Sequence, residues 1–256
     1  MEVDTLLPSK RRALIVEKLK KEKVLTMKAI CRDFEISMET LRRDINELAK
    51  DGLIIKEYGG IRIKEEQSGE SIIEQRLGLN LNKKEAIAQQ AVNIIQDGDC
   101  IYLDSGSTTL QIARFLSQKQ GLTIFTNSIP VMLACKNTNN DIISIGGRFR
   151  ASEQSVTSYD FLFDFDKINI DKAFLCASGL SIEKGITDFN IDEVATRKKI
   201  MSISQKVFLT CDSTKFDKVV TARVCDIDDI DVLITDKEAD KKFLSQLKSH
   251  QVEIIT

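Results

Sequence analysis

The sequence has no tryptophan, only two prolines and a single histidine, His250, in 256 residues. Its six cysteines stand far apart, and no two of them form a C-x-x-C pair. Zinc sites and disulfide frameworks need clustered cysteine or histidine residues, so this distribution argues against both. Most of the cysteines stand inside apolar runs, where a thiol usually acts as a small buried hydrophobe. We therefore expect no metal site and no cofactor.

Long apolar runs and strong charge are missing as well. A membrane-spanning helix needs about 20 consecutive apolar residues, and no run approaches that length. The N-terminus, Met1–Thr5, lacks the basic and then apolar pattern of a secretory signal, so we expect a cytoplasmic protein. The net charge is −2, and residues 1–63 hold 14 Lys and Arg against 11 Asp and Glu. Such a small surplus does not by itself indicate a nucleic-acid partner.

The stretch from Ser37 to Leu48 has the pattern of a DNA recognition helix. Ser37 is a good N-cap, and Glu39 and Asp44 place carboxylates toward the positive end of the helix dipole. An apolar stripe with helical spacing is formed by Leu41, Ile45 and Leu48. The other faces carry side chains that can reach base edges and phosphates: Ser37, Glu39, Thr40, Arg42, Arg43 and Asn46. An ordinary amphipathic surface helix with two solvated arginines has the same pattern and is the alternative.

The neighbouring segments favour the DNA-binding interpretation. A first helix is predicted over residues 10–21, and Thr26 is placed to cap a second. Two β-rich runs downstream of the recognition helix are joined through Gly59 and Gly60, which fit a hairpin turn. Three helices and a hairpin make a winged helix-turn-helix domain, which we assign to residues 7–63.

A second domain is predicted over residues 72–256, after a polar linker at 64–71. Strand patterns are found at residues 100–103, 122–125, 141–145, 172–177, 207–211, 232–234 and 252–255. Helical patterns are found at residues 82–95, 110–116, 130–135, 159–165, 191–204 and 239–247. This alternation predicts a mainly parallel sheet covered by helices, and the fold class is therefore α/β.

Polar and small residues follow the first predicted strand of this domain. In open α/β sheets, ligands bind outside the carboxyl ends of the strands. The strongest candidate is the run Asp104, Ser105, Gly106, Ser107, Thr108 and Thr109. A glycine and hydroxyls before a helix can present backbone N–H groups and the helix dipole to a phosphate. An ordinary turn whose hydroxyls cap the helix would use the same residues, and this alternative stays open.

The N-terminal domain resembles the signature of the DeoR family of bacterial regulators. The resemblance is carried by Val24-Leu25, Ile36-Ser37, Thr40-Leu41-Arg42-Arg43-Asp44-Ile45, Leu48, Asp51-Gly52-Leu53 and Tyr58-Gly59-Gly60. The family usually has Val and His where this chain has Ile36 and Tyr58. The resemblance implies that Tyr58 is a further DNA contact.

Further motifs follow the run from Asp104 to Thr109 in a characteristic order: Thr126-Asn127, Gly146-Gly147 with Arg150, Asp171-Lys172-Ala173-Phe174, Ser178-Gly179, Gly185-Ile186-Thr187, Glu193 and Asp212-Ser213-Thr214-Lys215-Phe216. In these motifs the second domain resembles the DeoR-family sensor domain, which is similar in fold to ribose-phosphate isomerase. The resemblance implies a phosphorylated sugar or related metabolite as effector, with the phosphate held by the run from Asp104 to Thr109. Arg150 and Lys215 would supply positive charge, and Asp171 and Glu193 would face sugar hydroxyls. The implied site is completed by Thr126, Asn127, Ser178, Gly179 and Arg197. Arg197 stands where the family commonly has Lys, so a planar fork replaces a point charge. For each charged residue, a surface ion pair is the alternative.

Together these features predict a DNA-binding transcriptional regulator, a repressor of a sugar-metabolism operon. Its partners would be double-stranded operator DNA, a phosphorylated sugar and further copies of itself. The rival is an isomerase-like enzyme, because Asp171, Glu193 and Lys215 supply an acid, a base and a cation. An isomerase, however, has no use for the N-terminal domain. A DNA-binding protein of purely architectural role would leave the second domain unexplained.

Overall fold

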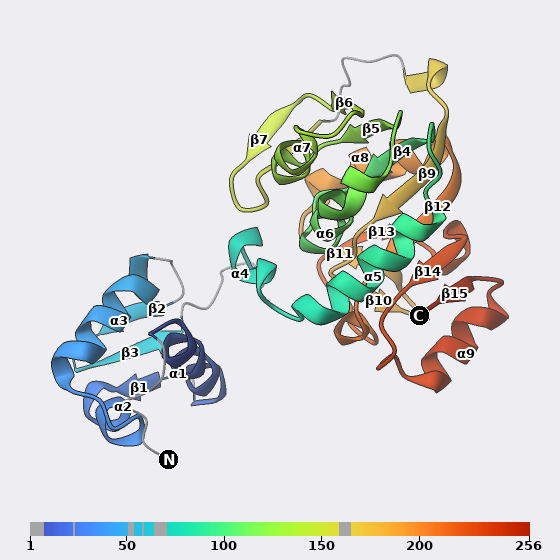
Figure 1. Ribbon diagram of the computed structural model, residues 1–256. Coiled ribbons are helices and arrows are strands. Elements are labelled where there is room, and N and C mark those ends of the chain that lie inside the picture. Colours follow the sequence, from blue (N-terminus) through green and yellow to red (C-terminus); the bar gives the residue numbers. More distant parts are fainter. Residues whose placement is uncertain (1–7, 23, 51–53, 58, 64–70, 159–164) are drawn as a thin grey trace. The chain divides into compact units, whose positions relative to one another are not determined.

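The chain divides into two units, Met1–Gly69 and Glu70–Thr256, each with a hydrophobic core of its own (Figure 1). The computed structural model describes residues 8–22, 24–50, 54–57, 59–63, 71–158 and 165–256. Within these ranges, no helix combines the length and the apolar character needed to cross a membrane.

The first unit is a winged helix-turn-helix, as the sequence predicts. Its elements are α1 (Pro8–Glu22), β1 (Val24–Thr26), α2 (Met27–Asp33), α3 (Met38–Lys50), β2 (Ile54–Glu57) and β3 (Gly60–Ile63). Thr26 caps α2, because its side chain accepts a hydrogen bond from the backbone N–H of Ala29 at 3.2 Å. The predicted hairpin forms, and β3 also pairs with β1, so the wing has three antiparallel strands. The expected helix stop at Gly52 lies outside the described residues.

A seven-stranded parallel sheet forms the centre of the second unit. Its strands are β4 (Cys100–Leu103), β5 (Thr123–Thr126), β6 (Asp141–Ser144), β9 (Ile170–Leu175), β12 (Ser204–Thr210), β14 (Val232–Ile234) and β15 (Glu253–Ile255). They lie in the order β15-β14-β12-β9-β4-β5-β6, and every pairing among them is parallel. The predicted mainly parallel α/β fold is therefore confirmed.

Helices bury both faces of this sheet. They are α5 (Leu81–Ile94), α6 (Ser107–Phe115), α7 (Ile129–Cys135), α8 (Ile191–Ser202) and α9 (Lys241–Ser249), and the short helix α4 (Ile73–Leu77) packs on α6. Neighbouring strand residues point to opposite faces, so Phe208 packs with α5, α6 and α7, whereas Leu209 packs with α8 and α9. Burial on both sides explains why the inner strands β4, β9, β12 and β14 contain nearly continuous apolar runs.

Several short elements were not predicted from the sequence. A hairpin is formed by β7 (Arg148–Arg150) and β8 (Ser155–Thr157), and a small antiparallel sheet is formed by β10 (Gly179–Ser181), β11 (Gly185–Asp188) and β13 (Ala222–Cys225). Helix α4 was also missed, and α6 begins at Ser107, three residues before the predicted start. The helix predicted over residues 159–165 falls almost wholly outside the described residues, and Phe165–Lys167 form a single 3₁₀ turn.

The order of the strands fixes where a ligand can bind. From β4 in the middle of the sheet the chain adds β5 and β6 on one side, and it then returns to add β9, β12, β14 and β15 on the other. The connections leaving β4 and β9 therefore run in opposite directions. A crevice forms at such a switch point, outside the carboxyl ends of the two strands.

Candidate functional site

Helix α3 presents a polar surface beside β2 in the first unit. Its start is fixed by Ser37, whose Oγ accepts a hydrogen bond from the backbone N–H of Thr40 at 3.1 Å. The expected apolar stripe lies in the core and consists of Leu41, Ile45 and Leu48. The expected contact residues lie outside the core, with Thr40 half-buried and the others exposed: Ser37, Glu39, Arg42, Arg43 and Asn46. The helix is thus delimited and oriented as the sequence predicts.

The polar residues of α3 differ in their local partners. Arg43 Nη2 lies 2.5 Å from Oε1 of Glu39, one turn away, whereas Arg42 has no ion pair within the described part of the chain. Asn46 Oδ1 accepts a hydrogen bond from Lys56 Nζ at 2.5 Å, which ties α3 to β2. Exposed ion pairs contribute only about 0–1 kcal/mol, so DNA phosphates can displace them. Tyr58, the wing residue expected to contact DNA, lies outside the described residues.

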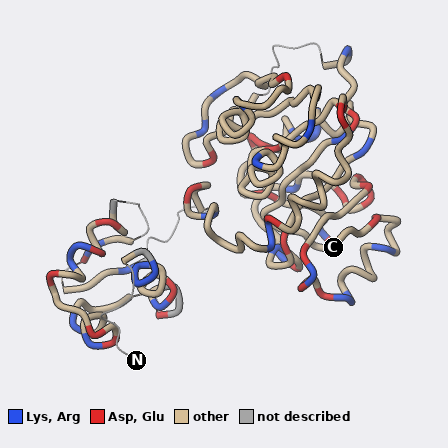
Figure 2. Tube along the Cα trace, in the orientation of Figure 1, with Lys and Arg blue, Asp and Glu red and all other residues tan. Residues whose placement is uncertain are grey.

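Asp44 has a different role from the one predicted. It is the seventh residue of α3, too far from the helix start to act on the dipole. Its Oδ2 and Oδ1 accept hydrogen bonds from Arg11 Nε at 2.6 Å and Arg11 Nη2 at 3.2 Å. Both residues are buried, at 3% and 8% exposure. Asp44 therefore joins α3 to α1 and sets the orientation of the polar surface. Elsewhere, basic and acidic residues are interspersed over both units (Figure 2).

In the second unit, Asp104 is the centre of a buried network at the switch point. It follows β4 directly and is completely buried. Its carboxylate accepts hydrogen bonds from the backbone N–H groups of Cys176 at 3.0 Å and Ser105 at 2.9 Å. The hydroxyl of Tyr102 donates to it at 3.2 Å. Burial raises the pKa of Asp104, and the guanidinium of Arg197 opposes that change. The oxygens of Asp104 therefore accept hydrogen bonds from the protein rather than from a ligand.

Arg197 bridges two acidic residues on different elements. Its Nε donates to Asp104 Oδ2 at 2.7 Å, and its Nη1 donates to Asp188 Oδ2 at 2.6 Å. Burial alone would lower the pKa of Arg197, but the charges of Asp104 and Asp188 raise it above its ordinary value. With only 3% of its side chain exposed, Arg197 has its charge neutralised within the network. The planar fork of the guanidinium group is what allows this double contact.

Glu193 joins α8 to the other side of the crevice. Its Oε1 accepts hydrogen bonds from Arg150 Nη1 at 3.1 Å and Ser155 Oγ at 2.7 Å. Its Oε2 accepts from Asn127 Nδ2 at 3.2 Å and Ser105 Oγ at 3.4 Å. Glu193 is 1% exposed, so this carboxylate is both buried and fully hydrogen bonded.

Two adjacent cavities open around this network, and we call them the inner and the outer cavity. The inner cavity has a volume of about 20 Å³ and is lined by Ser105, Arg150, Glu153, Ser178, Glu193 and Arg197. The outer cavity has a volume of about 150 Å³ and is lined by Lys84, Gly106, Ser107, Thr108, Asp212 and Lys215. Arg76, Cys176 and Ala177 line both. We refer to the two together as the cleft. It brings nine of the predicted effector residues to one place.

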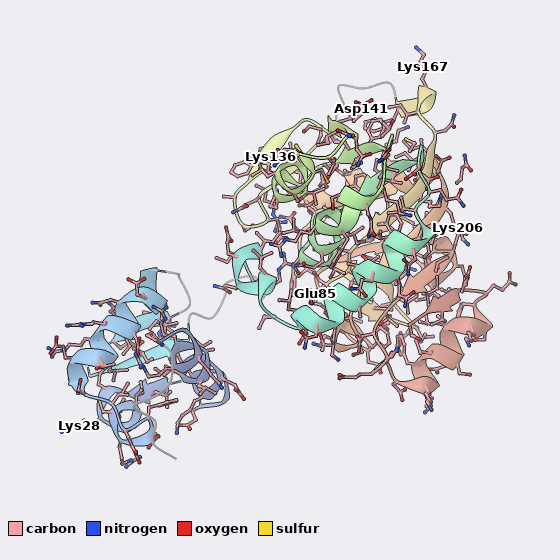
Figure 3. All side chains as sticks on the ribbon, in the orientation of Figure 1. Lys28, Glu85, Lys136, Asp141, Lys167 and Lys206 are labelled. Carbon is pink, nitrogen blue, oxygen red and sulfur yellow. The ribbon has the colours of Figure 1, made fainter. Side chains whose placement is uncertain are left out.

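Lys84 is a cleft residue that the sequence analysis missed. It precedes Glu85, which is labelled on α5 in Figure 3, and it is 4% exposed. Its Nζ donates a hydrogen bond to the backbone carbonyl of Arg76 at 2.6 Å. Burial lowers its pKa to about 8, and the charge of Asp212 only partly offsets this. The signal was present in the sequence, because Lys84 interrupts the apolar stripe of α5 three residues before Ile87.

The predicted residues Thr109, Thr126 and Asn127 do not line the cleft but form hydrogen bonds that hold the backbone and side chains around it. Thr109 Oγ1 donates to the backbone carbonyl of Asp104 at 2.6 Å, and Thr126 Oγ1 donates to that of Leu103 at 2.6 Å. Asn127 also accepts a hydrogen bond from the hydroxyl of Tyr102. A Cβ at Gly106 would lie 2.4 Å from the Sγ of Cys176, and one at Gly179 would lie 2.5 Å from a backbone carbonyl oxygen. These two glycines are therefore required by packing.

Asp171 is not part of the cleft. It lies near the start of β9, where its carboxylate accepts hydrogen bonds from Cys100 N at 2.8 Å and Gln205 Nε2 at 3.1 Å. The cleft lies at the other end of the same strand, about 15 Å away at the rise of a β-strand. Asp171 thus ties the starts of three neighbouring strands together.

Two family models match the chain. Residues 11–67 match the model described as a DeoR-like helix-turn-helix domain, and residues 79–237 match that of the DeoR C terminal sensor domain. The chain is 31% identical over 231 residues to the HTH-type transcriptional regulator IolR of Bacillus subtilis, covering 90% of this chain and 92% of that protein. It is 29% identical over 232 residues to the transcriptional repressor AccR of Agrobacterium fabrum, covering 88% of each. A solved structure of ribose 5-phosphate isomerase A from Methanocaldococcus jannaschii matches with a TM-score of 0.41 and 16% identity, over 54% of this chain and 55% of that one.

Proposed function

Since this chain belongs to the DeoR family of transcriptional regulators, we propose that it is a repressor whose affinity for operator DNA is set by a phosphorylated sugar bound in the cleft. The observation that carries this proposal is the pairing of two surfaces in one chain. One is the exposed polar face of α3 on a winged domain. The other is a cleft that collects cationic side chains at the ends of parallel strands.

The outer cavity is the part of the cleft that suits a phosphate. Gly106, Ser107 and Thr108 stand at the start of α6, where unpaired backbone N–H groups and the helix dipole favour an anion. Lys84 and Lys215 line the same cavity and supply positive charge. Arg197 and Arg150 are held by carboxylates deeper in the cleft. We therefore propose that the phosphate occupies the outer cavity and the sugar points inward.

We infer a sensor rather than an isomerase. The enzyme hypothesis takes Asp171, Glu193 and Lys215 as acid, base and cation. Asp171, however, lies at the N-terminal end of β9, away from the cleft at the strand's carboxyl end. Glu193 accepts four hydrogen bonds, which leaves no oxygen poised to take a proton. The curated relatives are named as regulators. Conversion of ribose 5-phosphate to ribulose 5-phosphate by the purified chain would contradict this inference.

We also propose that the chain acts as a homo-oligomer. One winged helix contacts few base pairs, and two half-sites related by symmetry multiply both affinity and specificity. The second unit is the larger and would hold the copies together, which leaves α3 of each copy free for DNA.

The effector hypothesis is tested first by ligand screening. A panel of pentose and hexose phosphates is added to the purified chain, and thermal unfolding is followed, because a ligand that binds the folded state raises its stability. The phosphates that bind are then added to operator-binding titrations. If no sugar phosphate of the panel changes either thermal stability or operator binding at millimolar concentration, the proposed function is contradicted.

A matched pair of variants then tests the place of the phosphate. Ser107→Asp puts a carboxylate at the first residue of α6, where it suits the helix dipole, whereas Ser107→Asn is neutral and of the same shape. We expect Ser107→Asp to weaken effector binding about 100-fold or more through charge repulsion. Its operator affinity without effector should match that of the wild type, and Ser107→Asn should respond normally. Gly106 is unsuitable for this test, because any side chain there would collide with Cys176.

A further inference from the structure

Helix α4 is the first described element after residues 64–70, and it is fastened to the turn between β7 and β8. The backbone N–H of Ile73 donates to the carbonyl of Ser152 at 2.8 Å. Gln154 Nε2 donates to Glu74 Oε1, and Arg76 forms an ion pair with Glu153. Three separate contacts therefore hold this short helix against one turn.

Arg76 connects α4 to both parts of the cleft. Its side chain lines the inner and the outer cavity, and its backbone carbonyl accepts the hydrogen bond of Lys84. Its Nε is buried and has no hydrogen-bond partner among the described residues. A buried donor without a partner is unfavourable, so a ligand oxygen near this atom would be stabilising. Arg76 is thus placed to bind an anion that reaches from the outer cavity inward.

The inner cavity is too small for a sugar in this structure. Its volume of about 20 Å³ is close to the room that one water molecule needs. Its three arginines are all engaged with carboxylates: Arg76 with Glu153, Arg150 with Glu193, and Arg197 with Asp104 and Asp188. A sugar can enter only if one of these pairs opens. The pair of Arg76 and Glu153 has the most exposed arginine, at 18% against 12% and 3%, so it loses least when it opens.

We propose that the ion pair of Arg76 and Glu153 is a latch that an anionic ligand opens. Arg76 leaves Glu153 for the ligand, the two cavities merge, and α4 loses one of its three contacts with the turn between β7 and β8. Because α4 directly follows residues 64–70 in the chain, the loss of this contact loosens the point where the chain enters the second unit, and operator affinity changes with it. The anion part of this inference rests on the proposed function, and it adds Arg76 as a ligand-binding residue and α4 as the coupling element.

The latch is tested without any ligand, using the full chain. Glu153→Gln removes the charge that holds Arg76 and keeps the shape of the side chain. We expect amide hydrogen exchange at residues 73–77 to become about fivefold faster or more, and the operator dissociation constant to change about fivefold or more, as in typical allosteric couplings. Circular dichroism checks folding, and Arg76→Gln breaks the same pair from the other side should Glu153→Gln fail to fold.

The matched control is Arg148→Gln, on the same hairpin. Arg148 pairs with Asp192 at 2.5 Å on the surface, and 76% of its side chain is exposed. We expect it to leave both exchange in α4 and operator affinity within twofold of the wild type. An equal effect of Arg148→Gln, or folded Glu153→Gln with wild-type exchange and operator affinity, would overturn the latch.

The ligand arm uses ribose 5-phosphate and inorganic phosphate as probes. If either alters operator binding by the wild type, Glu153→Gln alone must alter it in the same direction, and Arg76→Gln must weaken the response about tenfold or more, because a charged hydrogen bond is lost. An opposite direction, or a full response in Arg76→Gln, would overturn the latch. If neither those probes nor any sugar phosphate of the panel affects the wild type, the proposed function fails. The coupling of α4 to operator affinity is then still decided by the ligand-free arm.

Discussion

The pH dependence of effector binding should follow the ionisation of Lys84. Burial holds the pKa of this amine at about 8, against 10.5 for an ordinary lysine. That difference corresponds to about 3 kcal/mol against the charged form. A phosphate in the outer cavity would reverse it, because the anion favours the ammonium form. At a pH where the amine of Lys84 is neutral in the free protein, effector binding should therefore be accompanied by uptake of one proton at Lys84.

The size of the effect follows from these two states. Between pH 7 and pH 9 the charged fraction of an amine with a pKa of about 8 falls from nearly complete to about one tenth. Effector affinity should therefore fall about tenfold over this range, while the second ionisation of the phosphate is already complete. Lys84→Met should bind more weakly at pH 7 and show a flat profile.

Isothermal titration calorimetry at constant ionic strength measures this directly. Titrations of wild type and Lys84→Met with the effector found by screening, at half-unit steps from pH 7 to pH 9, give the two profiles. Buffers of different ionisation enthalpy report the proton taken up. Parallel profiles for the two proteins, or no proton uptake at pH 9, would refute the assignment of Lys84 to the phosphate.

Three further predictions concern the DNA-binding surface, its support and the assembly. Changing Arg42 or Arg43 to Ala should each weaken operator binding by about 1–3 kcal/mol, and a residue that contacts only phosphate should also flatten the salt dependence measured by fluorescence anisotropy. Asp44→Asn should destabilise the first unit by about 1.5–3 kcal/mol, because it removes the carboxylate charge that accepts hydrogen bonds from the buried guanidinium of Arg11; urea unfolding of residues 1–69 measures this. A fragment of residues 72–256 should sediment as an oligomer at micromolar concentration.

Each of these has a result that counts against it. If the folded double variant with Ala at both Arg42 and Arg43 binds operator with wild-type affinity at every salt concentration, α3 is not the helix that contacts DNA. If the free energy of unfolding of Asp44→Asn lies within about 1 kcal/mol of the wild-type value, the pair of Asp44 and Arg11 does not stabilise the first unit as we expect. If the fragment of residues 72–256 sediments as a monomer, the contacts between copies do not lie in the second unit.

Much of the fold could be predicted because its main elements satisfy local rules. Helix α3 has a capping serine and a regular apolar stripe, and β14 is a short apolar run between polar residues. The strands of the small sheet are only three or four residues long, which is too short to display a period. Their pairing is also distant in sequence, since Thr187 lies opposite Arg223. Such elements are fixed by tertiary contacts, which local patterns do not reveal.

The site was predicted less completely, for a related reason. Residue types that follow strands indicated the run after β4, and the structure places it at the switch point. The partners of each charge come from other segments: Arg197 meets Asp104 across 93 positions, and Arg76 meets Glu153 across 77. Nothing local distinguishes a charge that faces a ligand from one that is neutralised inside. Asp171 shows the converse, because a carboxylate that matches the family pattern lies at the N-terminal end of β9, opposite to the cleft.

The strand order also bears on when, during synthesis, the effector site can form relative to the DNA-binding domain. Among the described residues, the hydrophobic core of the first unit is formed by side chains between Ile15 and Ile61. Domains near the N-terminus generally fold first during synthesis. The sheet, in contrast, begins with its central strand β4, which must wait for β9 about 70 residues later, and the buried charges around Asp104 are balanced only once Arg197 has emerged. A nascent chain therefore holds a finished DNA-binding fold well before it holds any means of switching it.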